Sequence, residues 1–198
     1  MFNKPRGCIT ACSDARHKTV MDYFPKDERE RLFPIGRLDK DTVGLLIITD
    51  DGSLAFNIAN PEHRVKKTYR FWAKGALDEE KLVKLRDGVT ISTKRGDITA
   101  SGDVKHIADA TLRDIVDLLE DDTAKIVNTR LGDVPVTCLE ITITEGKKHQ
   151  VKKMALAVGL RIVYLERISI AGLLLDEVLP RGEFRALTEA EISLLSDN

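Results

Sequence analysis

The sequence has only three cysteines, and their arrangement argues against a disulfide framework. Cys8 and Cys12 lie four residues apart, Cys138 is far from both, and there is no Cys-x-x-Cys pair. An odd count does not support a set of disulfides. A zinc site built from Cys8, Cys12 and His17 is an alternative, but its spacing differs from that of common structural zinc sites. We therefore expect idle thiols in a reducing compartment, the cytoplasm.

Long hydrophobic runs and several common catalytic motifs are also missing. No apolar stretch reaches the roughly 18 residues of a membrane span, and the N-terminus lacks the apolar region of a signal peptide. The sequence contains no glycine-rich phosphate loop, no His-Glu-x-x-His motif and no Gly-x-Ser-x-Gly motif. These absences argue against a membrane partner and against three large classes of enzyme.

A large net charge is absent too, but the charges are clustered. The formal net charge is −1 at pH 7. Basic residues gather at 4–6, 64–70 and 147–153, and acidic residues gather at 78–80 and 120–122. A near-neutral sum can hide a basic face that binds phosphate. Random clustering on a solvated surface remains the alternative.

Apolar patterning favours an α+β fold. Predicted strands lie at residues 7–11, 45–48, 67–74, 136–144 and 161–170. Predicted helices lie at residues 53–59, 78–86, 111–119, 148–158 and beyond Thr188, where Thr188 and Glu191 form a capping box and Ile192 and Leu195 are expected to be buried. Their irregular alternation argues against a regular βαβ series. A chain of 198 residues fits one domain or two intimately packed lobes.

Asp39 is the first candidate catalytic residue. It precedes the apolar run at residues 45–48, so its backbone is expected to be anchored by the core while its side chain opens into a cleft. Arg37, two residues away, favours the ionised carboxylate, which can serve as a nucleophile or a base. An Asx-turn with a structural ion pair is the alternative.

Two further segments combine residues suited to nucleic acid. Tyr69 stands among the cations of residues 67–70, where an aromatic ring can stack on a base; a simple core tyrosine is the alternative. Residues 145–153 place four lysines and a histidine at a strand-to-helix junction, where free backbone amides attract anions. A solvated basic helix start is the alternative there.

Taken together, these segments resemble one family, the RsuA-type RNA pseudouridine synthases. The resemblance rests on the order and spacing of residues 3–7, 36–46, 51–52, 67–69, 145–154, 167–173 and 179–188, and so covers nearly the whole chain. The Gly-Arg-Leu-Asp-x-x-Thr-x-Gly-Leu-Leu segment is highly specific, and the Gly-x-x-His-Gln-Val-Lys segment supports it independently.

The resemblance implies both a fold and a reaction. The implied fold is α+β, with a mixed, largely antiparallel central sheet flanked by helices and a central cleft. Residues 1–198 would form one catalytic domain of two packed lobes, without the N-terminal α-L RNA-binding module that many relatives carry. The implied function is isomerisation of a specific uridine in ribosomal RNA by a monomeric cytoplasmic enzyme that needs no cofactor and no metal.

The same resemblance assigns roles to residues. Asp39 matches the essential aspartate, Tyr69 the tyrosine that stacks on the target base, and Lys152 the cation that pairs with the carboxylate. The basic clusters and Arg37, which would shape the pocket or contact a phosphate, supply the candidate RNA-binding residues: Arg37, Lys4, Arg64, Lys66, Lys67, Lys147, Lys148, His149, Gln150 and Lys153.

Some features depart from the family pattern, and two other functions compete. Lys147 stands where arginine is more common, which removes bidentate phosphate geometry. Residues 109–135 form a longer connection than is usual in this family. The competing functions are a non-catalytic RNA-binding or ribosome-assembly protein on the same fold and a carboxylate-dependent nucleoside hydrolase. Retention of Asp39, Tyr69 and Lys152 argues against the first, and the lack of an evident water-activating partner argues against the second.

Overall fold

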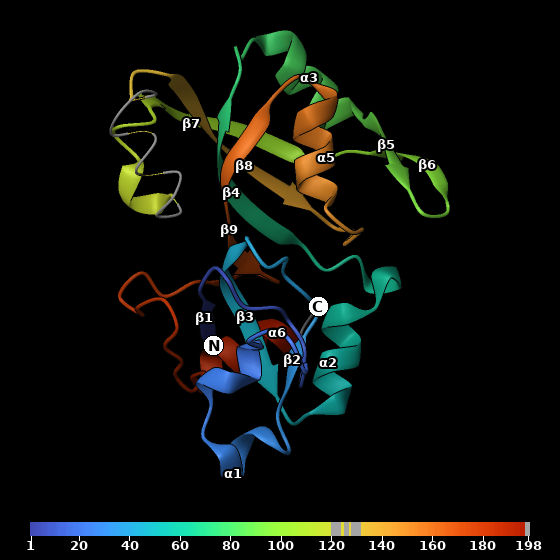
Figure 1. The fold of residues 1–198 in the computed structure, drawn as a ribbon. Coiled ribbons are helices and arrows are strands. Elements are labelled where there is room, and N and C mark those ends of the chain that lie inside the picture. Colours follow the sequence, from blue (N-terminus) through green and yellow to red (C-terminus); the bar gives the residue numbers. More distant parts are fainter. Residues whose placement is uncertain (120–123, 125–126, 128–131, 197–198) are drawn as a thin grey trace. The chain divides into compact units, whose positions relative to one another are not determined.

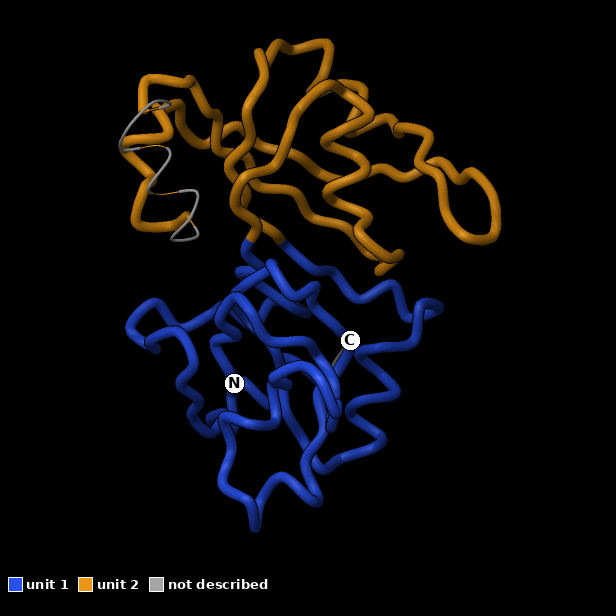
Figure 2. Tube along the Cα trace, viewed as in Figure 1, with its two compact units in different colours: residues 1–68, 166–198 blue, residues 69–165 orange. Residues whose placement is uncertain are grey.

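The computed structural model describes residues 1–119, 124, 127 and 132–196. The chain divides into two compact units (Figure 2). Unit 1 comprises residues 1–68 and 166–198, and unit 2 comprises residues 69–165. Two strands, β4 (Lys67–Lys74) and β9 (Arg161–Ile170), contain the boundaries and contribute residues to both units.

Unit 1 contains short strands and helices that follow one another along the chain (Figure 1). Its strand order is β1-β3-β9, with β2 also paired to β3 and β10 to β9. The β3–β9 pair is parallel, whereas the pairs of β1 and β2 with β3 and of β10 with β9 are antiparallel. Its elements are β1 (Phe2–Lys4), the 3-10 helix η1 (Val20–Tyr23), α1 (Lys26–Arg29), β2 (Phe33–Ile35), β3 (Val43–Thr49), α2 (Gly52–Ala59), the 3-10 helix η2 (Pro61–His63), β10 (Leu173–Leu174) and α6 (Glu189–Ser196).

Strand β3 forms the centre of unit 1 because its apolar residues are buried on both faces. Leu45 and Ile47 belong to one hydrophobic cluster, and Leu46 belongs to another with Phe2. Gly44 begins the run with φ +99, and a Cβ there would clash with the backbone carbonyl of Arg167 on β9. Only glycine allows this close approach of β3 to its parallel neighbour.

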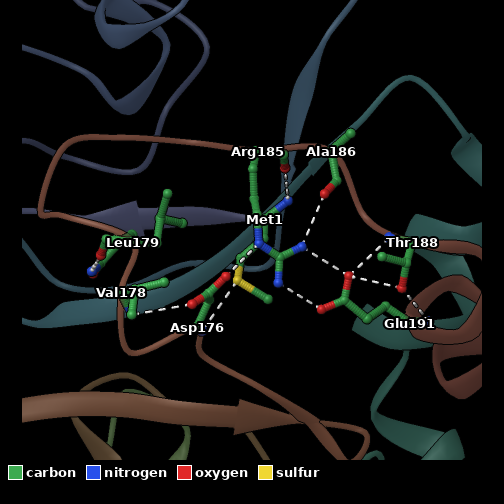
Figure 3. A network of polar contacts seen from close by, with 9 residues as sticks. Met1, Asp176, Val178, Leu179, Arg185, Ala186, Thr188 and Glu191 are labelled. Carbon is green, nitrogen blue, oxygen red and sulfur yellow. Dashed lines mark hydrogen bonds and ion pairs between the residues drawn. The ribbon is translucent and has the colours of Figure 1, made fainter.

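Arg185 fastens the C-terminal part of unit 1 (Figure 3). Its Nε donates to Asp176 at 2.7 Å, and its two terminal nitrogens donate to the Glu191 carboxylate at 2.7 and 2.9 Å. Glu191 also accepts from the Thr188 amide at 2.8 Å, which confirms the predicted capping box of α6. Leu195 on that helix is buried as expected, whereas Ile192 is 45% exposed, contrary to the prediction.

Unit 2 carries strands in the order β9-β4-β8-β7 and a separate two-stranded sheet, β5-β6. Pairing of β7 with β8 is antiparallel, and so is that of β5 with β6. Burial alternates with the two-residue period of a strand along β4 and along β8 from Leu139 onward. Its further elements are α3 (Glu79–Asp87), β5 (Val89–Thr93), β6 (Gly96–Ala100), β7 (Asp103–Thr111), the 3-10 helix η3 (Val116–Leu118), β8 (Pro135–Ile143) and α5 (Gln150–Ala157).

The expected mixed, largely antiparallel α+β architecture is confirmed, but two predicted elements are wrong. Residues 111–119 form turns and η3 rather than an α-helix. The amides of Leu112 and Arg113 donate to the carbonyls of Val134 and Gly132, so chain reversal replaces the helical pattern. Residues 7–11 form no strand beyond one bridge between Ile9 and Thr19. Among the described residues, no helix is long and apolar enough to cross a bilayer.

Candidate active site

Asp39 lies in the loop between β2 and β3, and its neighbours fix the backbone on both sides. The Leu38 amide donates to the Thr10 hydroxyl at 3.1 Å, and the same hydroxyl donates to the Leu38 carbonyl at 2.9 Å. The Thr42 amide donates to the Asp39 carbonyl at 3.1 Å, closing a turn. Leu38, Thr10 and Thr42 are buried, while Asp39 is half-buried. The backbone that carries the carboxylate is therefore fixed by hydrogen bonds, while the Asp39 side chain stays partly accessible to solvent.

Lys4 forms hydrogen bonds to the backbone of the same loop. It is completely buried, and its ammonium donates to the carbonyls of Thr42 at 2.9 Å, Pro5 at 3.0 Å and Lys40 at 3.5 Å. Burial lowers the pKa of Lys4 to about 8, and the nearby Cys8 side chain and the Asp41 and Asp39 carboxylates partly offset this shift. The side chain lies in the interior rather than on the basic surface that the sequence indicated, because its three protons satisfy backbone oxygens.

The other candidate cations of unit 1 do reach solvent. Arg37 is exposed, next to Leu38. Arg64 is exposed in a left-handed conformation with φ 51 at the end of η2, and Lys66 is exposed. Lys67 is half-buried, and its ammonium donates to the Val65 carbonyl at 2.9 Å. Arg37, Arg64 and Lys66 are therefore available to an anion, and Lys67 is partly engaged with its own backbone.

Tyr69 lies on the buried face of β4. The alternation along β4 buries Tyr69, Phe71 and Ala73, with Tyr69 8% exposed. On the opposite face Arg70 donates to Glu140 at 2.8 and 3.0 Å. Little of the Tyr69 side chain is therefore accessible to solvent.

Gln150 organises the basic loop before α5. It is 3% exposed; its amide nitrogen donates to Glu145 at 2.8 Å, and its amide oxygen accepts from the Lys147 amide at 3.0 Å. His149 precedes it in a left-handed conformation with φ 57. Lys147, Lys148 and His149 are exposed. Gln150 thus holds the loop instead of facing RNA, and the loop presents three neighbouring side chains to solvent.

The remaining two lysines lie in the first turn of α5. Lys152 and Lys153 are both half-buried, and the Lys153 ammonium donates to the Ser92 carbonyl on β5. The three predicted catalytic residues therefore come from both units: Asp39 belongs to unit 1, whereas Tyr69 and Lys152 belong to unit 2.

Several residues that shape these loops escaped sequence reasoning. Thr10 clamps Leu38 from 28 positions away, and no local pattern marks it. The Thr42 hydroxyl is buried with no hydrogen-bond partner among the described atoms, although Thr42 stood in the recognised motif.

Across residues 1–119, 124, 127 and 132–196, no three His, Cys, Asp or Glu side chains are grouped to hold a metal ion. Cys8 is buried and Cys12 exposed.

Comparison with known proteins identifies the family. Residues 1–157 match the family described as RNA pseudouridylate synthase. The chain belongs to this family. An uncharacterized RNA pseudouridine synthase of Bacillus subtilis, YtzG, is 38% identical over 198 residues, covering 100% of this chain and 72% of the relative. Ribosomal small subunit pseudouridine synthase A of Salmonella typhimurium is 36% identical over 193 residues, covering 98% of this chain and 71% of the relative.

Solved structures agree with the family assignment. A crystal structure of a pseudouridylate synthase superposes with a TM-score of 0.77 at 30% identity, covering 98% of this chain and 71% of that one. A human protein, RNA Pseudouridylate Synthase Domain Containing 1, has a TM-score of 0.52 at 15% identity, covering 85% of this chain and 72% of its own, and shares the fold. The chain is therefore an RNA pseudouridine synthase of the RsuA type, and the catalytic interpretation is favoured over a non-catalytic binder.

Proposed function

We propose that the protein converts one uridine of small-subunit ribosomal RNA to pseudouridine, with Asp39, Tyr69 and Lys152 as its catalytic residues. The observation that carries the proposal is the half-buried Asp39 on a loop clamped through Leu38 and Thr42 in a chain of this family. The choice of ribosomal RNA follows relatives named ribosomal small subunit pseudouridine synthase A.

Asp39 acts on the ribose of a nucleotide that has been flipped out of its stack. A base inside a helix cannot be turned over, so extrusion must precede chemistry. The carboxylate serves either as a nucleophile toward the sugar or as a base toward a sugar proton. The bond from uracil nitrogen to ribose breaks, the base turns, and a bond from a ring carbon to the same ribose carbon forms. The ring carbon that forms the new bond loses its proton, and the freed ring nitrogen gains one. The overall change is therefore an isomerisation.

Tyr69 and Lys152 supply what a lone carboxylate lacks. The ring of Tyr69, held by the β4 core, stacks on the flipped base. Lys152 is the cation that we assign to the catalytic carboxylate. Arg37 and the exposed cations before α5 bind phosphates of the substrate RNA. Lys4 and Gln150 act through the loops that they hold.

The test is to map the product. Purified small-subunit and large-subunit rRNA would be incubated separately with the protein, and pseudouridine located by chemical adduct formation and primer extension. We expect one major site in the small-subunit RNA, abolished by Asp39→Asn and by Asp39→Ala. RNA binding without product in the wild type would favour a non-catalytic binder. Release of free uracil would favour a nucleoside hydrolase, and a large-subunit site would overturn the proposed substrate.

We also propose that the enzyme is cytoplasmic, because a target within ribosomal RNA requires access to ribosome assembly. We further propose that it is a monomer. Light scattering coupled to size-exclusion chromatography would give a mass near the 22.1 kDa of one chain. A mass twice as large at enzyme concentrations used for activity would contradict the monomer.

A further inference from the structure

The β5–β6 hairpin has an ordered tip with two exposed cations. Register pairs Thr93 with Gly96, which leaves Lys94 and Arg95 at the tip, and both are exposed. The Thr93 hydroxyl donates to the Gly96 carbonyl at 2.7 Å and accepts from the Arg95 amide at 3.2 Å. Backbone and hydroxyl groups therefore hold the turn, and its two cationic side chains are not needed for the turn itself.

The nearest acidic side chain along the hairpin is already engaged. Asp97 accepts a hydrogen bond of 2.7 Å from the Ser92 hydroxyl across the strand pair. This contact directs the carboxylate toward its cross-strand partner. The two exposed cations outnumber this carboxylate, so the tip presents net positive charge that an external anion can approach.

The hairpin is fastened to α5, the helix that follows the basic loop (Figure 1). Val89, Ile91 and Ala100 are buried, and β5 packs against α5. The ammonium of Lys153 donates to the Ser92 carbonyl, two residues before Lys94. A two-stranded hairpin alone is marginally stable in water, so these contacts give the tip a defined place beside α5.

Unit 2 thus carries two exposed basic groups on elements that are joined directly. One is the loop residues Lys147, Lys148 and His149 before α5, and the other is Lys94 and Arg95. Lys153, in the first turn of α5, connects them through Ser92. A nucleic-acid backbone repeats its negative charge along its length and can satisfy both groups at once.

We propose that Lys94 and Arg95 bind the phosphate backbone of the substrate RNA, on the same surface as Lys147, Lys148 and His149. This inference rests on the proposed function and extends it by naming a second phosphate-binding element. The hairpin tip adds affinity beyond the target nucleotide and takes no part in bond making or breaking.

The test is the double variant Lys94→Ala/Arg95→Ala with a fragment of small-subunit ribosomal RNA that the wild type binds. Each lost phosphate contact reduces the slope of log affinity against log salt by about 0.7 to 0.9. Two lost contacts raise Kd about 25- to 60-fold near 0.1 M salt, and the activity loss appears in KM rather than in kcat. The control is Arg16→Ala/Lys26→Ala, which removes two exposed positive charges from unit 1.

The outcomes separate this inference from the proposed function. Pseudouridine formation by the wild type with unchanged Kd and salt slope in the hairpin variant overturns the inference and leaves the function standing. Absence of pseudouridine from the wild type overturns the function, whereas weaker RNA binding by the variant still supports the hairpin contact. Normal binding of naked RNA with lost binding of ribosomal particles assigns the tip to a protein surface and overturns the inference. Circular dichroism confirms that the variant is folded.

Discussion

The ammonium of Lys4 donates a hydrogen bond of 2.9 Å to the backbone carbonyl of Thr42, joining the end of β1 to the loop that carries Asp39. Strand β1 pairs with β3 in register Lys4↔Gly44, so this bond spans neighbouring strands at the end of the loop. A buried cation with such partners stabilises a backbone conformation rather than an external anion. The loop geometry therefore depends on a side chain 35 positions before Asp39.

Replacement of Lys4 by Met should expose this role. The variant leaves backbone carbonyls without their donor, so we expect the free energy of unfolding to fall by about 1–3 kcal/mol. A shifted Asp39 loop should lower kcat about 10- to 100-fold. KM for RNA should change little, because the ammonium does not face the substrate. Chemical denaturation and steady-state kinetics measure these quantities, and a raised KM with normal kcat would show that Lys4 contacts RNA instead.

Asp39 and Asp41 provide a matched pair of carboxylates on one loop. Asp39→Asn should lower the single-turnover rate by at least about 1000-fold, since it removes the carboxylate that we propose to react. Asp41 is exposed, and Asp41→Asn makes the same chemical change two residues away. We expect the second variant to remain within about threefold of the wild type. Rapid-quench assays of product formation compare the two, and equal losses would remove Asp39 from its assigned role.

Gln150 should behave as a loop-positioning residue. Gln150→Leu unpairs the Lys147 amide and the Glu145 carboxylate, which should destabilise the protein by about 1–3 kcal/mol. The freed loop should raise KM for RNA several-fold without abolishing turnover. Leu156→Ala on the same helix is the control, because Leu156 is 66% exposed and its truncation should leave stability nearly unchanged. Full stability of Gln150→Leu would contradict the role inferred from its two hydrogen bonds.

The Arg185–Glu191 pair makes stability depend on acid pH. Hydrogen bonds from Arg185 and Thr188 lower the pKa of Glu191 to about 2 from its ordinary 4.5. A lowered carboxyl pKa stabilises the fold above the unfolded value, and this contribution is lost as pH falls from about 4.5 to 2. Glu191→Gln should therefore be less stable than the wild type at pH 7, with a difference that shrinks toward pH 2.

Urea unfolding at a series of pH values measures that dependence. Glu189→Gln is the matched control, since Glu189 is exposed in the first turn of the same helix. Its stability difference from the wild type should vary little over the acid range. A difference for Glu191→Gln that is constant with pH would show that the ion pair does not set the titration.

Local pattern predicted the elements whose burial follows a simple period. The apolar run of β3, the strand bounds of β4 and β9, and the helix α2 after Asp51 all follow from spacing and turn residues. Leu112 and Ile115 are buried, but the helix predicted at residues 111–119 does not form, because backbone hydrogen bonds to Gly132 and Val134 replace it. Apolar periodicity predicts which side chains are buried, but it does not predict hydrogen bonds to backbone groups that are distant in the chain.

The sequence by itself determined the family and the chemical identity of the catalytic candidates, since both are properties of residue type and order. Only the tertiary structure decided which polar residues face inward. Lys4 and Gln150 carry the same donor groups as surface residues that bind phosphate, but the packing of β1 against β3 and of α5 on its loop buries them. Burial is set by segments distant in the chain, and a buried donor must be satisfied by backbone or side-chain oxygens close by.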